Sequence, residues 1–391
     1  MRILFLSFIP IIRHVGGMQK VTDCIISEMK KRGHEVIVVY YEKRKIPVDF
    51  QFPCQHYYLD TTEKPLEKCL SEWGKIIDHF KPDCIINTSS YIQKSCFLLK
   101  NTPQEIQKIT INHLQPFQGI EHTKVSHQYI SAHSPKFMLI RLLAKYVPSL
   151  LGNFYVRSEK KLFKNILQYS DKYCVLTNGY IDRTLKYYPK VEKEKLFAIP
   201  NPNPYWDDNS LPEEKQNIIL YVGRLSNYPK NLISFVRVWQ RLERSNPDWR
   251  AVVVGTGPIL NQTKSYCEKN HVSRISFEGQ KRNVQDYYKM SKIVCVTSFF
   301  ESWNMSLVEG MNYGCVPVAY QSYEATYDII DHQKNGFLIS PFSEKEMADR
   351  IQSLIDHPDT LCEMSQNAVE KAKKYSTPII VDKWEQLIAN K

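Results

Sequence analysis

The 391 residues are 43% hydrophobic and 24% charged, which is the composition of a globular protein and excludes a collagen-like or disordered chain. The length suffices for two or three domains. The net charge of +11 lies in the first 200 residues, where 30 Lys and Arg outnumber 18 Asp and Glu, whereas residues 201–391 have 22 against 23. The first half therefore either carries a solvated basic surface or meets an anionic partner, such as a membrane or a nucleic acid.

Ten cysteines are spread along the chain without a Cys-x-x-Cys pair, and several lie inside apolar runs. This pattern predicts reduced, buried thiols in a cytoplasmic protein and argues against a disulfide framework or a zinc site. The apolar residues 3–9 are not followed by a small-residue cleavage site, so we expect a buried first strand rather than a signal peptide. No run of about 18 uncharged apolar residues predicts a transmembrane helix.

Short apolar runs alternate with helical patterns in the first half of the chain. Such continuous apolar runs are typical of parallel strands that are covered on both faces. Helical spacing of apolar residues predicts helices between them, at Met18–Arg32 and Lys64–Phe80. The expected strands are Arg2–Phe8, Glu35–Tyr40, Asp83–Thr88, Lys108–Asn112 and Lys172–Thr177.

The second half repeats the alternation after a proline-rich segment at Ala198–Pro204, which we interpret as a linker because alternating prolines end helices and sheets. The chain is therefore predicted to be α/β, with two Rossmann-like, doubly wound parallel-sheet domains that face a cleft. Their predicted bounds are residues 1–200 and 201–375. The expected strands of the second are Asn217–Val222, Arg250–Gly255, Ile275–Glu278, Lys292–Thr297 and Cys315–Ala319, and its expected helices include Asn231–Arg244, Val284–Met290 and Met305–Tyr313.

Two glutamates flank the start of a predicted helix near Met305, directly after a predicted strand. Ligands of open α/β sheets bind beyond the carboxyl ends of the strands, and the unpaired N–H groups of a helix start favour a phosphate. Glu301 in the loop can accept hydrogen bonds from sugar hydroxyls, and Glu309 in the helix can hold a ribose diol. The alternative is that both are merely acids favoured near a helix N-terminus.

Glu301-x7-Glu309, followed by Gly314–Val318, resembles the donor-site signature of glycosyltransferase family 4, the group 1 glycosyltransferases. The resemblance implies the GT-B fold and a retaining enzyme that uses a nucleotide diphosphate sugar. It also implies that Glu309 holds the ribose and that Glu301 holds the sugar together with the backbone of the following residues. Those residues are Trp303, Asn304, Met305, Ser306 and Leu307.

Arg224 and Lys230 bracket one loop after the first strand of the second domain. Two cations there can clamp a diphosphate and neutralise the charge that grows on a leaving nucleotide. The loop matches the family's Gly-Arg-Leu…Lys element, which binds the donor pyrophosphate. An isolated Arg and Lys in a loop would more often be solvated surface charges.

Three further glycines and a glutamine match positions of the family. Gly16 and Gly17 follow the first strand, where the family has a loop near the donor phosphates, although they would also suit a simple strand-to-helix turn. Gly257 lies in a Gly-Thr-Gly-Pro turn that resembles a nucleotide-pocket element. Gln280 lies where the family's backbone holds the base.

His113 ends a strand of the first domain, at a position where the family has a histidine near the transferred sugar. The resemblance implies that His113 orients or stabilises that sugar, and the alternative is a structural histidine. The family often has Glu-Gly-Phe where this chain has Glu301-Ser302-Trp303, which leaves the identity of the sugar open.

Lys124–Leu167 is rich in Lys, Arg, Leu and aromatic residues. The segment either lies at a membrane interface, where it would meet a lipid-linked acceptor, or packs its apolar face in the first domain. Its apolar residues at near-helical spacing are Leu139, Leu143, Tyr146, Leu150 and Phe154. The resemblance further implies that a C-terminal helix, residues 376–391, crosses back onto the first domain.

These observations predict a glycosyltransferase. We expect it to be metal-independent, because no Asp-x-Asp occurs in the chain. It would move a hexose-type sugar from a UDP- or GDP-linked donor to a glycan or lipid-linked acceptor during synthesis of a capsule, lipopolysaccharide or exopolysaccharide. It would be cytoplasmic, on the inner face of the membrane if it contacts one, with no cofactor. The alternatives are another GT-B chemistry, such as sugar-nucleotide epimerisation, and a non-enzymatic module that binds nucleotides or anionic polymers. No recognised nucleic-acid motif occurs, so we expect no nucleic-acid partner.

Overall fold

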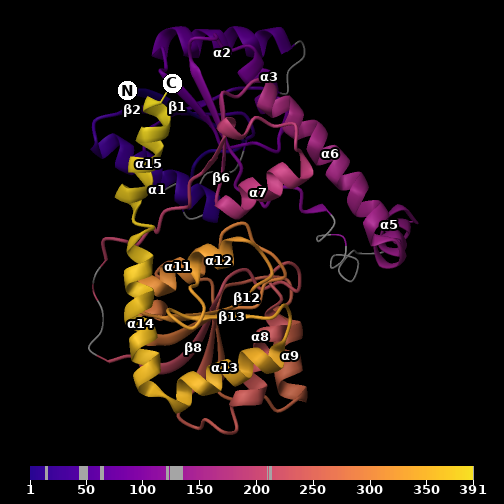
Figure 1. Cartoon of the computed structure of the whole chain (residues 1–391), viewed down its shortest axis with the longest axis vertical. Helices are drawn as coiled ribbons and strands as arrows, with labels where there is room; N and C mark the ends of the chain where they lie inside the picture. Colours follow the sequence, from indigo (N-terminus) through magenta and orange to yellow (C-terminus); the bar gives the residue numbers. More distant parts are fainter. Residues whose placement is uncertain are drawn as a thin grey trace. The chain divides into compact units, whose positions relative to one another are not determined.

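The computed structural model describes residues 1–13, 16–43, 52–61, 66–119, 123, 135–208, 210 and 214–390. The chain forms two compact units (Figure 1). Unit 1 comprises Met1–Pro202 and Thr377–Lys391, and unit 2 comprises Asn203–Ser376. Each unit is built on one parallel sheet, so the predicted α/β class with two Rossmann-like sheets is confirmed.

The sheet of unit 1 has seven strands in the order β3-β2-β1-β4-β5-β6-β7, and all neighbouring pairs are parallel. Its central strand β1 buries five consecutive residues because helices cover both faces of the sheet. The strands are β1 (Arg2–Ser7), β2 (Glu35–Tyr40), β3 (Gln55–Tyr58), β4 (Cys84–Asn87), β5 (Gln107–Ile111), β6 (Lys172–Val175) and β7 (Leu196–Ala198). The helices are α1 (Gly17–Lys31), α2 (Leu66–Phe80), α3 (Gln93–Lys100), α5 (Pro135–Tyr146), α6 (Pro148–Gln168), α7 (Asn178–Tyr187), the short 3-10 helix η1 (Lys193–Lys195) and α15 (Thr377–Ala389).

Unit 2 has a six-stranded parallel sheet in the order β10-β9-β8-β11-β12-β13. Strand order reverses between β8 and β11, which is where open α/β sheets bind ligands. The strands are β8 (Gln216–Val222), β9 (Arg250–Val254), β10 (Ile275–Gly279), β11 (Ser291–Val296), β12 (Val316–Tyr320) and β13 (Phe337–Ile339). The helices are α8 (Leu232–Leu242), α9 (Leu260–Lys269), α10 (Gln285–Met290), α11 (Met305–Asn312), α12 (Ala325–Ile329), α13 (Glu344–Asp356) and α14 (Pro358–Lys373).

The C-terminal helix α15 belongs to unit 1, where it packs beside α1 (Figure 1). The Arg32 guanidinium donates to the carboxylate of Asp382 at 2.6 Å, to that of Glu385 at 2.7 Å and to the carbonyl of Pro378 at 3.0 Å. The indole of Trp384 is 1% exposed. A forked cation at the end of α1 and a buried aromatic ring therefore fasten the last helix to the first unit.

All ten predicted strands occur, with ends that shift by one or two residues. Three further strands escaped prediction, β3, β7 and β13, and each lies at or beside a sheet edge with only three or four residues. Such short strands carry little periodicity. Ala198 is the last residue of β7, although the alternating prolines that follow it led us to place it in the linker.

The apolar residues of the Lys124–Leu167 segment do not pack in the first unit as one alternative expected. Leu139, Tyr146, Leu150 and Phe154 are each more than half exposed, on α5 and α6. That alternative is therefore wrong for these four side chains, because helical periodicity identifies an apolar face without identifying what covers it.

The ten cysteines all lie among the described residues and form no disulfide, and all but Cys54 and Cys362 are buried. Across the described helices, none combines the length and the apolar character that crossing a membrane requires.

Trp384→Ala is expected to destabilise unit 1 by about 3–5 kcal/mol, because it removes a fully buried indole and leaves a cavity between α15 and its neighbours. Calorimetric unfolding of the full chain measures the change. Lys383→Ala, one position along the same helix and exposed, is the matched control and should leave the transition in place.

Candidate functional site

The predicted donor residues of unit 2 all follow strands that are neighbours in its sheet. Arg224 follows β8, Gly257 follows β9, Gln280 follows β10 and Glu301 follows β11. Because the strands are parallel and adjacent in the order β10-β9-β8-β11, these loops emerge from the same edge of the sheet. We call this edge, with the start of α11, the donor edge.

Backbone hydrogen bonds join the loops of the donor edge. The N–H of Gly223 donates to the carbonyl of Val254 at 3.0 Å, and that of Leu225 donates to the carbonyl of Thr256 at 2.9 Å. A Cβ on Gly257 would lie 2.0 Å from the carbonyl oxygen of Leu225. Gly257 therefore has a structural role, since only glycine lets the loops after β8 and β9 approach this closely.

Lys230 and Glu301 meet across two of these loops. The Nζ of Lys230 lies 2.6 Å from Oε1 of Glu301, and the hydroxyl of Ser298 donates to the same oxygen at 2.7 Å. The N–H of Phe299 donates to the carbonyl of Pro229 at 2.8 Å, which holds the two loops together. The structure thus brings together the cation predicted for the diphosphate and the carboxylate predicted for the sugar.

Arg224 differs from Lys230 in its surroundings. Its side chain is exposed, and no ion pair or hydrogen bond to it is found within the part of the chain that the structure describes. An exposed guanidinium with its five donors uncommitted suits an anionic ligand such as a phosphate. Gln280 is likewise exposed, at the end of β10.

Glu309 is 5% exposed, and the hydroxyl of Tyr288 donates to its Oε2 at 2.9 Å. Burial, reinforced by the neighbouring Glu309 carboxylate, holds the pKa of Tyr288 well above its ordinary value, so the phenol keeps the proton that it donates. Tyr288 therefore positions the Glu309 carboxylate. Sequence reasoning missed Tyr288, because a tyrosine in a short helix carries no motif.

Helix α11 begins with a side-chain cap. Oδ1 of Asn304 accepts from the N–H of Leu307 at 3.3 Å and from the hydroxyl of Ser306 at 2.6 Å. The indole of Trp303 is 5% exposed and packs edge-on against Tyr375. The side chains of Trp303, Asn304 and Leu307 are therefore buried, and what this segment can present to a ligand is backbone, together with the intermediate side chain of Met305.

Two of the predicted residues of unit 1 lie at the start of α1. Gly16 is the N-cap residue with φ 176°, an extended conformation that any residue adopts, and Gly17 is the first helical residue. A Cβ on Gly16 would meet only the flexible end of Gln19, at 2.8 Å. The local backbone therefore does not demand glycine at residue 16.

His113 follows β5 in unit 1 and is 8% exposed. Burial lowers the pKa of its imidazole to about 4, against the opposing effect of a hydrogen bond with Asn201. The ring is consequently neutral near pH 7. Within the described residues its Nδ1 has no hydrogen-bond partner. A neutral imidazole can hold a ligand hydroxyl but brings no positive charge to it.

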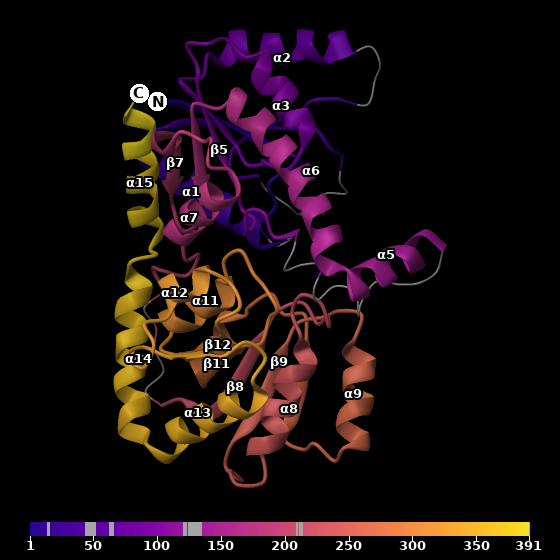
Figure 2. The same cartoon turned by 45° about the vertical axis from the view of Figure 1, so that its right-hand side comes forward.

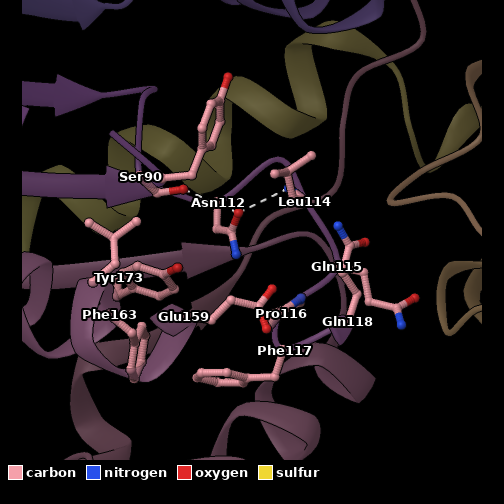
Figure 3. A pocket seen from close by; sticks show the side chains of 12 residues that line it. Ser90, Asn112, Leu114, Gln115, Pro116, Phe117, Gln118, Glu159, Phe163 and Tyr173 are labelled. Atoms are coloured by element: carbon pink, nitrogen blue, oxygen red, sulfur yellow. Dashed lines mark hydrogen bonds between the residues drawn. The ribbon is translucent and has the colours of Figure 1, made fainter. Parts of the chain in front are cut away.

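A pocket with polar and apolar lining lies beyond the carboxyl ends of β4 and β5 and against β6 (Figure 3). Asn112 and Leu114, the chain neighbours of His113, belong to its lining. Side chains of Asn112, Glu159 and Tyr173 face its interior, and the hydroxyl of Ser90 donates to Oδ1 of Asn112 at 3.1 Å. Burial raises the pKa of Tyr173, so its phenol remains a donor. The pocket therefore brings together the carboxylate of Glu159, the amide of Asn112 and the hydroxyl of Tyr173.

Two glutamines and an aromatic ring complete this pocket (Figure 3). The amide oxygens of Gln115 and Gln118 are buried without a hydrogen-bond partner among the described residues, and Phe117 lies between them in sequence. Orphaned buried acceptors suit a ligand rich in hydroxyl groups, and the Phe117 ring packs against Phe163 and Tyr187. Sequence reasoning identified only the neighbouring His113, since the pocket is assembled from four separate segments.

Residues 204–375 match the family model described as "Glycosyl transferases group 1", which is almost the whole of unit 2. The similarity to this family that Glu301-x7-Glu309 indicated is thereby confirmed.

Two curated proteins are similar over more of the chain. An uncharacterized glycosyltransferase of Haemophilus influenzae is 27% identical over 244 residues, which are 62% of this chain and 67% of that protein. The second, from Campylobacter jejuni, is 25% identical to this chain, and the match covers 59% of this chain and 64% of that protein. Its name is GalNAc-alpha-(1->4)-GalNAc-alpha-(1->3)-diNAcBac-PP-undecaprenol alpha-1,4-N-acetyl-D-galactosaminyltransferase. The chain thus matches about two thirds of the length of these relatives.

Among solved structures, a mutant of TarM from S. aureus in complex with fondaparinux, alpha-GlcNAc-glycerol and UDP superposes with a TM-score of 0.74. It is 15% identical, and the comparison covers 100% of both chains. This likeness shows the GT-B fold.

Gly257→Ala is expected to destabilise unit 2 by about 3 kcal/mol, because the new methyl group would collide with the immobile carbonyl of Leu225. Gly74→Ala is the matched control. Nothing lies within 4 Å of a Cβ at Gly74, inside α2, so that change should stabilise by about 0.5–1 kcal/mol. Denaturant unfolding measures both, and equal effects of the two changes would contradict the close approach of the loops.

His113 makes the stability of unit 1 depend on pH. Its folded pKa of about 4 lies below the ordinary 6.5, so the unfolded chain takes up the proton first as the pH falls. The stabilisation is complete above pH 6.5 and is lost toward pH 4. The unfolding free energy of the wild type should fall between pH 7 and pH 5. In His113→Gln this fall should be smaller by about 2 kcal/mol. His79→Gln, at an exposed helix end, should leave the wild-type slope, and an unchanged slope in His113→Gln would show that the imidazole titrates normally.

Proposed function

With residues 204–375 assigned to the group 1 glycosyltransferases, we propose that the protein is a retaining glycosyltransferase that moves a hexose-type sugar from a nucleotide diphosphate donor to a glycan or lipid-linked acceptor. The observation that carries this proposal is the donor edge of unit 2. There Lys230 and Glu301 are in contact, and Arg224 is exposed on the loop that also carries Lys230. The start of α11 and the buried Glu309 follow Glu301 in the chain.

Each part of the donor has a chemical counterpart at this edge. Lys230 and Arg224 bind the diphosphate and offset the charge that it gains when the bond from the anomeric carbon to the phosphate oxygen breaks. Glu301 accepts hydrogen bonds from the sugar hydroxyls. Glu309, fixed by Tyr288, accepts them from the ribose diol. The two cations supply positive charge without a metal ion, which makes the proposed transfer metal-independent.

The contact between Lys230 and Glu301 has a consequence for donor binding. A phosphate that takes over the Lys230 ammonium removes one partner of the Glu301 carboxylate, which also accepts from the hydroxyl of Ser298. Glu301 then turns to new donors, and sugar hydroxyls provide them. Binding of the diphosphate therefore favours binding of the sugar at the same place.

The acceptor is assigned to unit 1, where the pocket beside His113 offers partners for hydroxyl groups. An acceptor hydroxyl forms the new bond to the anomeric carbon and loses its proton, while the nucleotide diphosphate leaves. The name of the Campylobacter relative specifies a glycan on a lipid diphosphate, which supports an acceptor of that class and a role in surface polysaccharide synthesis. We further propose a cytoplasmic enzyme whose basic first unit contacts the membrane that carries such an acceptor.

Lys230→Ala and Glu309→Gln are expected to abolish the thermal stabilisation that the correct donor nucleotide gives. The purified chain is scanned without metal against UDP, GDP and their sugars. A ligand at about 100 times its dissociation constant stabilises the native state by about 2.7 kcal/mol. Lys345→Ala, an equally charged change on exposed α13, should retain the shift. Loss of the shift in all three variants, or in none, would contradict the assignment of the donor edge.

Release of nucleotide diphosphate separates the proposed reaction from its alternatives. A transferase releases it in proportion to added glycan acceptor, in the presence of a chelator, and yields a product whose anomeric configuration by NMR equals that of the donor. An epimerase would convert the sugar nucleotide without acceptor. A binding module would bind the nucleotide and release nothing.

A further inference from the structure

Exposed apolar side chains are concentrated on one helix pair of unit 1. Of the 14 large hydrophobic residues exposed among the described part of the chain, eight lie between residues 138 and 155, on α5 and α6 or at their junction. They are Met138, Leu139, Leu142, Tyr146, Val147, Leu150, Phe154 and Tyr155. A concentration of this kind on a water-exposed surface marks an interaction site.

The spacing of five of these residues places them on one face of each helix. On α5, Leu139, Leu142 and Tyr146 follow one another at intervals of three and four residues, and on α6 Leu150 and Phe154 are four apart. The residues that α6 buries, among them Gly152 and Val156, lie on the other side of the helix. The apolar face therefore looks away from the unit, which reverses the usual arrangement of a surface helix.

Basic residues border the apolar face. Residues 135–168 contain seven Lys and Arg and one acidic residue, Glu159. Arg157, Lys161 and Lys164 are exposed and continue the Leu150–Phe154 face along α6, toward the end that contacts α3. One continuous helix surface thus passes from apolar at its beginning to basic farther along.

Figures 1 and 2 show that α5 lies at the end of α6 remote from α3, so that the two helices project from unit 1 as a hairpin. The packing partner of α5 is α6. Leu150 and Phe154 near the tip are 67% and 66% exposed, and Tyr146 is 68% exposed.

We propose that the α5–α6 hairpin is a membrane anchor that inserts its apolar tip into an anionic lipid bilayer. The tip residues enter the boundary between headgroups and acyl chains, and the basic residues farther along α6 meet the lipid phosphates. An anionic bilayer is the partner that offers an apolar layer beneath a negative layer, in the order in which this surface presents apolar and basic groups. The proposal rests on the proposed function only in its purpose, which is to bring unit 1 to a lipid-linked acceptor.

Sedimentation of the full chain with vesicles tests the anchor. Wild-type protein should bind vesicles of phosphatidylcholine with about 30% phosphatidylglycerol, bind vesicles of phosphatidylcholine alone much more weakly, and dissociate as salt is raised. The double variant L150E/F154E should lower the apparent affinity at least about tenfold, since it places two carboxylates in the apolar tip. The triple variant R157Q/K161Q/K164Q should remove most of the salt dependence and leave the weaker apolar binding.

The control places the same kind of change elsewhere. Tyr327 and Ile379 are exposed apolar residues outside the hairpin, and Y327E/I379E should bind vesicles as the wild type does. Thermal unfolding verifies that each variant is folded.

Three outcomes would overturn the anchor. Wild-type protein could stay in solution with anionic vesicles, the hairpin variants could bind them unchanged, or light scattering could show a dimer that L150E/F154E dissociates, in which case the face joins two copies of the chain. The nucleotide-induced thermal shift is measured on the same variants, because it reports on unit 2. In the wild-type protein, a nucleotide shift without vesicle binding contradicts the anchor alone, and vesicle binding without a nucleotide shift contradicts the donor site alone. In the hairpin variants, a retained nucleotide shift together with weakened vesicle binding is the expected result.

Discussion

The close approach of the loops after β8 and β9 is the constraint on which the donor edge depends. Gly255 adopts φ +137°, and a Cβ there would lie 1.9 Å from the carbonyl of Gly223, just as one on Gly257 would collide with Leu225. These backbone contacts position the loop that carries Arg224 and Lys230. Lys230 therefore pairs with Glu301 from a loop whose backbone is already fixed, which lowers the ordering cost when a ligand binds.

Charge is distributed between the units in a way that net charge alone conceals. Residues 201–391 are nearly neutral, yet Lys230 pairs with the partly buried Glu301 at one edge of their sheet, and Arg224 is exposed on the same loop as Lys230. The first 200 residues carry an excess of twelve positive charges, and half of it lies in residues 135–168. Half of the positive excess of the first 200 residues thus belongs to the α5–α6 hairpin, while the buried His113 is neutral near pH 7.

The strands could be predicted from the sequence because they depend on local signals, and the donor residues were proposed from signals of the same local kind. Buried parallel strands are continuous apolar runs, and Glu301-x7-Glu309 places two carboxylates around one helix start. The sequence could not predict Tyr288, which reaches Glu309 only through the packing of α10 beside α11. The pocket at Asn112 likewise gathers side chains from segments far apart in the chain.

The α5–α6 segment shows a different limit of sequence reasoning. Its near-helical spacing of apolar residues agrees with the helices α5 and α6, although the spacing does not reveal that there are two of them, and it is compatible with an apolar face turned inward or outward. The burial pattern decides between them, because Ala144 and Gly152 are buried, whereas Leu142 and Leu150 on the opposite sides of their helices are exposed. Periodicity alone does not show whether a helix packs inward through its leucine side or through the side that carries alanine and glycine.

Hydrogen–deuterium exchange of the full chain with and without the donor nucleotide tests the central claim most directly. If unit 2 binds the nucleotide diphosphate at its donor edge, the backbone amides of residues 223–231 and 301–309 should become protected, and those around β12 and β13 should not change. Saturating nucleotide that leaves both segments exchanging at their original rates would contradict the donor edge as the binding site.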